Sequence, residues 1–133
     1  MNSYRTRKII QTYVDGWKEN NINKILKALT NSCVIVESHG PTYHGTDDVK
    51  DWVNSWKKDG YKVNRWDIIS FLYSKNTTVF EWVFEFSSDK TEKRTIEGIT
   101  IAKFKDKKIV YLREYRTTKS LYDWKRIKKL DAF

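Results

Sequence analysis

A chain of 133 residues predicts one domain with a single core, since domains commonly run to about 100–200 residues. No apolar run approaches the roughly 18 residues of a membrane span, and the polar segment 1–8 resembles no secretory signal, so we expect a cytoplasmic protein. One cysteine excludes an internal disulfide, and with only two histidines beside it no zinc-ligand spacing arises. Neither a metal nor another cofactor is therefore expected.

The positive charge is concentrated near the C-terminus. Residues 103–133 hold eleven basic and four acidic side chains, which is +7 of the total net charge of +9. Such a field attracts nucleic acid or acidic surfaces. These basic residues form no regular stripe, however, so nucleic-acid binding is not expected. We interpret residues 1–133 as one domain in which 118–133 form a basic C-terminal tail, whose apolar segment 120–124 should dock on the body.

Three helices and a short strand are predicted in the N-terminal half. Apolar residues at three- and four-residue spacing predict helices over residues 5–18 and 21–29. A run of β-branched residues predicts a strand over 33–37. The segment 40–45 contains the only proline and two glycines, which is typical of a turn, and Thr46 then caps a third amphipathic helix.

From residue 61 to 116 the sequence predicts only strands. Alternating patterns separated by short polar turns predict an antiparallel meander over residues 63–74, 77–87, 93–105 and 108–116. Strands of this length coil strongly enough to wrap over a layer of helices. We therefore expect an α+β cone, in which a strongly curved, mostly antiparallel sheet wraps over the three helices and leaves a pocket between them.

Alternation along the strands sorts the sheet residues into two faces. The even-numbered face is expected to be concave, and in the last two strands it carries Thr100, Val110, Leu112 and Glu114. Glu114 is then the one carboxylate of the sheet that points inward. The opposite face, with Ile99 among its residues, is too apolar for a sheet open to water, so a homodimer through this convex face is expected.

Several short motifs, taken in order, resemble one superfamily. They are Ile9-Ile10-Gln11-Thr12-Tyr13-Val14, Glu37 ending the first strand, Gly45-Thr46, Phe80-Glu81-Trp82, Lys108-Ile109-Val110 and Arg113-Glu114-Tyr115. Over residues 5–117 their order and spacing resemble the nuclear transport factor 2 superfamily, and its small SnoaL-like members in particular. The resemblance implies a cone-shaped fold around a small-molecule pocket, and pairing of two subunits.

Candidate catalytic residues follow from this resemblance. Similarity to ketosteroid isomerase, of the same superfamily, implies that Glu37 is the base and Tyr13 the oxyanion donor. The second oxyanion donor falls near Thr100, whose hydroxyl is a much weaker acid, so steroid isomerisation by the same machinery is not expected. Glu114 is similar in placement to the acidic residue that SnoaL-like cyclases carry in their last strand, as a second acid or an orienting group.

Each of these residues has a structural alternative. In the alternative, Tyr13 is a ring of the hydrophobic core, and Glu37 forms an ion pair with a Lys or Arg at the sheet edge. Glu114 neutralises Arg116 or a tail lysine. His39 shares the face of Glu37, as a proton partner or as an ordinary surface residue.

Two classes of function stay open at this point. The aromatic residues Trp17, Tyr43, Trp56 and Trp82 form either the walls of a ligand pocket or the core, and Leu112 and Thr100 are further candidate ligand contacts. In one interpretation the chain is a cofactor-free proton-transfer enzyme that acts on a small, mainly apolar molecule, as an isomerase, cyclase, dehydratase or hydrolase. In the other it is a non-catalytic ligand-binding or protein-interaction module of the same fold.

Overall fold

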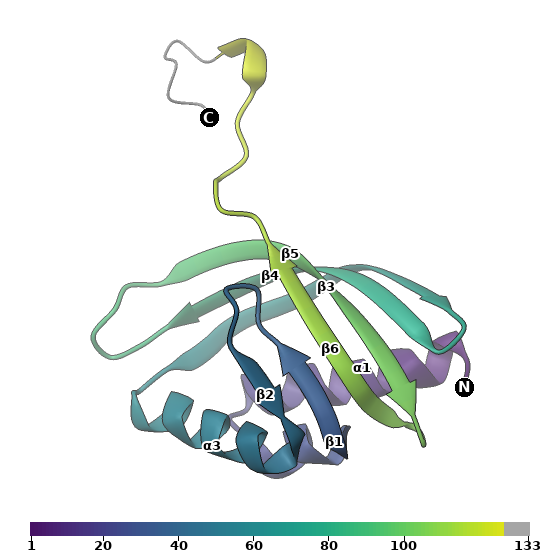
Figure 1. Cartoon of the computed structure of the whole chain (residues 1–133). Helices are drawn as coiled ribbons and strands as arrows, with labels where there is room; N and C mark the ends of the chain where they lie inside the picture. The colour runs from purple at the N-terminus through teal and green to yellow at the C-terminus, as the bar shows by residue number, and fades with distance from the viewer. Residues whose placement is uncertain (127–133) are drawn as a thin grey trace.

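The computed structural model describes residues 1–126. In this part the helices are α1 (Ser3–Lys18), α2 (Ile22–Lys27) and α3 (Gly45–Lys58), and a single 3₁₀ turn covers Trp124–Arg126. The strands are β1 (Leu29–Val36), β2 (Thr42–His44), β3 (Lys62–Ser74), β4 (Thr77–Ser87), β5 (Arg94–Lys105) and β6 (Lys108–Arg116). Figure 1 shows a strongly curved sheet with α1 and α3 beneath it, so the predicted α+β cone is confirmed.

All strands form one sheet in the order β2-β1-β6-β5-β4-β3. The four long strands pair as an antiparallel meander, and their bounds agree with the prediction to within one residue. β1 pairs with β6 in parallel and with β2 antiparallel. The prediction of a mostly antiparallel sheet is therefore confirmed, with one parallel junction.

The first half of the chain departs from the prediction in three places. The second helix ends at Lys27, and β1 begins at Leu29, because the backbone N–H of Ile109 in β6 donates to the Ala28 carbonyl at 2.8 Å and recruits this segment into the sheet. Residues 42–44 form an edge strand instead of a turn. The N-cap of α3 is His44, not Thr46, and its backbone N–H donates to the Asp48 carboxylate at 2.8 Å.

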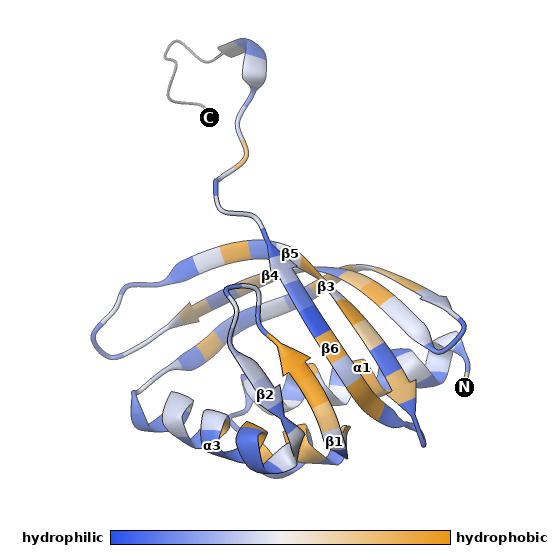
Figure 2. Cartoon of the chain, viewed as in Figure 1, coloured by the Kyte–Doolittle hydropathy of each residue, from blue (hydrophilic) through white to orange (hydrophobic). Residues whose placement is uncertain are grey.

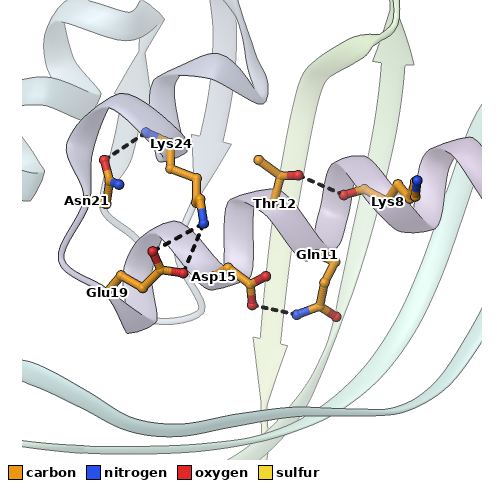
Figure 3. Close-up of polar contacts among 7 residues, drawn as sticks. All are labelled: Lys8, Gln11, Thr12, Asp15, Glu19, Asn21 and Lys24. Atoms are coloured by element: carbon orange, nitrogen blue, oxygen red, sulfur yellow. Dashed lines mark hydrogen bonds and ion pairs between the residues drawn. The ribbon is translucent and has the colours of Figure 1, made fainter.

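Short polar contacts fix the turn between α1 and α2 (Figure 3). The side chain of Asn21 accepts a hydrogen bond from the Lys24 backbone N–H at 3.1 Å, and the Lys24 ammonium pairs with Glu19 at 3.0 Å. Exposed pairs of this kind stabilise a fold by less than about 1 kcal/mol. The close approach of the helices comes from Gly16, where a Cβ would stand 2.7 Å from the Ile25 side chain.

The core lies between the concave face of the sheet and the helices. The most apolar stretch is β1, and apolar bands cross the long strands (Figure 2). The even-numbered residues Thr100 and Leu112 are buried, as predicted for the concave face. Val110 is an exception, because the register of β5 and β6 shifts after Lys103 and places Ile109 in the core instead.

Residues 117–126 leave the sheet and extend away from the body (Figure 1). The predicted docking of residues 120–124 is wrong, since Leu121 is 83% and Trp124 is 73% exposed. Burying so few apolar side chains does not offset the entropy of ordering the segment, at about 1–2 kcal/mol per residue. The rest of the predicted tail lies outside the described residues. Within residues 1–126, no helix has both the length and the apolar character needed to cross a membrane.

Candidate functional site

A cavity of about 400 Å³ lies between the helices and the concave sheet face. Nine of the side chains that line it are aromatic, and they come from α1, α3, β3, β4 and the segment before β3. Six polar or charged residues complete most of the wall: Glu37, Ser38, His39, Arg94, Glu114 and Arg116. A mainly apolar hollow with a few convergent polar groups is the usual form of a small-molecule site.

Most of the residues singled out in the sequence meet in this cavity. Its wall includes Tyr13, Trp17, Glu37, His39, Trp56, Trp82 and Glu114. Leu112 and Thr100 lie outside it, as buried residues of the sheet. The Thr100 hydroxyl accepts a hydrogen bond from the Trp82 indole at 2.7 Å, so it holds a wall residue from behind.

The two carboxylates of the wall come from neighbouring strands. β1 and β6 are parallel, and Val36 is paired with Arg113. Glu37 and Glu114 each follow that pair by one residue, which brings both to the same end of the junction. Within residues 1–126 neither carboxylate has a basic partner within 4.0 Å, so the alternatives in which they form ion pairs are not seen in this part.

Glu37 is held by a tyrosine that stands outside the cavity wall. The Tyr43 hydroxyl donates to Oε1 of Glu37 at 2.6 Å, and the Tyr43 ring stacks on Trp52 with centroids 4.0 Å apart. Burial and this bond to Glu37 raise the pKa of Tyr43, so its hydroxyl keeps its proton and remains a donor. Through this short hydrogen bond Tyr43 fixes the direction of the Glu37 carboxyl group.

Glu114 is in a different electrostatic state. Burial, followed by the nearby charge of Glu37, raises the pKa of Glu114 to about 8. Near neutral pH this group is therefore mostly a neutral acid that can donate a hydrogen bond. Burial, and then the charge of Glu114, also raise the pKa of Tyr13, which stays protonated. The site thus combines one oriented carboxylate with two protonated donors.

Replacing Glu114 by Gln should stabilise the protein at alkaline pH. The pKa of Glu114 in the folded state lies well above the ordinary pKa of a glutamate in the unfolded chain. Between these two pKa values the folded state binds more protons, so it loses stability as pH rises toward about 8. One pKa unit corresponds to about 1.4 kcal/mol, and partial exposure reduces the effect, so we expect a gain of about 2 kcal/mol above pH 8 and almost none near pH 5.

Urea unfolding at both pH values measures this difference, with the exposed residue Glu92 replaced by Gln as the control. An equal effect of Glu114→Gln at the two pH values would contradict the raised pKa.

Part of the aromatic wall was not among the residues predicted from the sequence. Trp66, Phe84 and Phe86 line the cavity from β3 and β4, and Tyr61 precedes β3. Phe84 and Phe86 share the even-numbered face with Trp82, so alternation alone could have found them. Trp66 was obscured by the register shifts of β3 at residues 63–65 and 68–70.

Two indole N–H groups of the wall have no partner. The Nε1 atoms of Trp56 and Trp66 are buried and donate to no acceptor within residues 1–126. Such donors are rare in folded proteins and call for an explanation. In the same part of the chain, no three His, Cys, Asp or Glu side chains gather closely enough to hold a metal ion.

Comparison with known proteins relates this chain to one family. Residues 10–112 match the family described as the SnoaL-like domain. Among curated proteins none matches the chain.

Several solved structures share the fold at low sequence identity. An epoxide hydrolase of M. tuberculosis, described as LEH-like, is 9% identical with a TM-score of 0.77, over 86% of this chain and 84% of that one. A protein of Catenulispora acidiphila with a ketosteroid isomerase-like fold, in complex with trimethylamine, is 15% identical with a TM-score of 0.72, over 80% and 83%. TerC, co-crystallized with polyporic acid, is 15% identical with a TM-score of 0.73, over 86% and 92%.

Proposed function

The chain belongs to the SnoaL-like domain family, and from this premise we propose that its cavity binds a small, mainly apolar molecule and catalyses proton transfer on it. The observation that carries the proposal is the unequal pair of carboxyl groups. Glu37 is a carboxylate oriented by Tyr43, whereas Glu114 holds its proton near neutral pH. A buried acid that keeps its proton, next to a second carboxyl group held in a fixed direction, is suited to act with it as acid and base in one site.

The proposed chemistry begins with proton abstraction. Glu37 takes a proton from a carbon next to a carbonyl or from an attacking hydroxyl, and negative charge develops on a ligand oxygen. The hydroxyl of Tyr13 and the protonated Glu114 donate to that oxygen. The aromatic walls exclude water, which strengthens these interactions. Isomerisation, cyclisation, dehydration and epoxide opening all fit this scheme.

The ligand should present hydrogen-bond acceptors. The unpartnered indole N–H groups of Trp56 and Trp66 are donors only, so acceptor oxygens placed against these walls would satisfy them. A volume of about 400 Å³ suits a molecule of one to a few rings. The structurally similar TerC was co-crystallized with polyporic acid, and the M. tuberculosis protein is an epoxide hydrolase, which supports a small oxygenated ligand for this cavity.

A thermal-shift screen of small ketones, lactones and epoxides tests this function. We expect the compounds that raise the melting temperature to be those with carbonyl or ether oxygens on an apolar frame. Trp66→Phe keeps an aromatic wall but removes one donor, so it should lower the affinity for these ligands by about threefold to tenfold.

Hydrocarbons of the same shape serve as the control, because their affinity should not respond to Trp66→Phe. If hydrocarbons and oxygenated ligands bind equally well, the acceptor requirement is wrong. If no apolar compound binds, the cavity is not a ligand site.

We also propose a homodimer through the convex sheet face. Ile99 and Tyr115 are paired on neighbouring strands and are 38% and 46% exposed on this face. Burial of such a pair against a second copy would remove apolar surface from water. Sedimentation equilibrium should give twice the chain mass, and Ile99→Lys should give a monomer. A monomeric wild-type protein would contradict this. The cytoplasmic location stays a prediction.

A further inference from the structure

We propose that the ligand of the cavity carries an anionic group, and that Arg94 and Arg116 bind this group at the cavity rim while the apolar part lies inside. The proposal rests on the proposed function, because it requires a ligand in the cavity. It adds a chemical class, namely a ring compound with a carboxylate, sulfonate or phosphate arm.

A second hollow adjoins the aromatic cavity. It has a volume of about 390 Å³ and shares Arg94, Ile96 and Arg116 with the cavity wall. It lies between residues 94–97 of β5, which extend beyond the end of β6, and residues 117–121. The two hollows are therefore joined at the two arginines, and one ligand can reach both.

The charges differ between the two hollows. Both hollows share Arg94 and Arg116, but the aromatic cavity adds the carboxyl groups Glu37 and Glu114, whereas the second hollow adds Lys119 and a single acid, Glu97. An anionic group is repelled by Glu37 and attracted to the basic hollow. The ligand is thus oriented, with its charged arm outward and its reacting part next to Glu37.

The two guanidinium groups are available for a ligand. Within residues 1–126 neither Arg94 nor Arg116 has a carboxylate within 4.0 Å. Arg94 lies over the Phe86 ring at 5.9 Å, which fixes its stem beside the aromatic wall. A planar guanidinium binds carboxylate, sulfonate or phosphate oxygens through paired N–H donors.

The strand register allows both arginines to reach one anion. Arg116 is paired with Gly98, which has no side chain to separate Arg116 from β5. Arg94 lies four residues before Gly98 on the same face, about 13 Å along the strand at 3.3 Å per residue. Both arginines line the same two hollows, so their long side chains can approach one ligand group from the two strands.

Two fluorescent dyes of nearly the same shape test the proposal. Anilinonaphthalene sulfonate carries an anionic arm, and N-phenylnaphthylamine lacks it. The double variant Arg94→Gln/Arg116→Gln should lower the affinity for the sulfonate dye by about tenfold and change the affinity for the neutral dye by less than about twofold. The double variant Lys105→Gln/Lys108→Gln removes the same charge from exposed residues at the far end of β5 and β6, and it should change neither affinity.

The outcomes separate this proposal from the function on which it rests. If the arginine variant and the lysine variant lower the affinity for the sulfonate dye equally, or if neither lowers it, the proposal of an anionic ligand group bound by the two arginines is wrong. The cavity itself then remains a ligand site. Ser38→Trp fills the cavity from its wall. If the neutral dye fails to bind the wild type, or binds Ser38→Trp equally well, both proposals are overturned.

Discussion

Replacing Glu37 by Gln is expected to lower turnover about a thousandfold while ligand affinity changes by less than about threefold. Gln keeps the shape and still accepts the hydrogen bond that Tyr43 donates at 2.6 Å, but its amide oxygen cannot take up a proton. The measurement compares kcat with the dissociation constant for a ligand found in the thermal-shift screen that the wild type converts.

Tyr43→Phe is the informative companion, because it removes the bond that orients Glu37 and leaves the carboxylate in place. We expect an intermediate loss of kcat. Glu81→Gln serves as the matched control, since Glu81 is an exposed carboxylate of β4. If Glu37→Gln keeps full turnover, Glu37 is not the base. If the wild type binds ligands but converts none, the non-catalytic ligand-binding alternative holds.

Gly98→Ala is expected to lower the free energy of unfolding by about 3 kcal/mol or more. A Cβ at this position would stand 2.1 Å from the Tyr115 carbonyl oxygen and 2.7 Å from the Trp82 ring. Backbone atoms cannot move aside as the end of a flexible side chain can, so the pairing of β5 with β6 must open. The displaced Trp82 would also strain its hydrogen bond to Thr100.

Urea unfolding measures this loss, and Glu97→Ala, at the exposed neighbouring position, should cost less than about 1 kcal/mol. Failure of Gly98→Ala to fold agrees with the expectation. A loss below about 1 kcal/mol would contradict it and would mean that β5 and β6 separate at little cost. The same variant should weaken ligand binding, because Trp82 and Arg116 both adjoin Gly98.

The candidate site could be foreseen only in part. Glu37, Glu114 and Tyr13 were picked out through resemblance and strand alternation, and the structure brings all three to one cavity. Their roles stay proposals. The bond between Tyr43 and Glu37 depends on the fold of the hairpin between β1 and β2, because residues 42–44 were expected to form a turn.

The rim arginines had no signal in the sequence. Arg94 opens β5 and Arg116 closes β6, at positions where charged residues are usual. Their position becomes notable only in the folded sheet. Gly98 of β5 is paired with Arg116 at the end of β6, and the four residues of β5 before Gly98 extend past that end and border a hollow beside the aromatic cavity. Strand ends and offsets are set by pairing between distant segments, and no local pattern records them.

By itself the sequence determined the helices α1 and α3 and the four long strands, since hydrophobic periodicity and turn residues act over a few neighbouring positions. Only the tertiary structure decided the parallel pairing of β1 with β6, the edge strand β2, and the shift that places Ile109 rather than Val110 in the core. Each of these depends on hydrogen bonds between residues far apart in the chain. The raised pKa of Glu114 arises in the same way, because its burial and its proximity to Glu37 exist only once the sheet has curved over the helices.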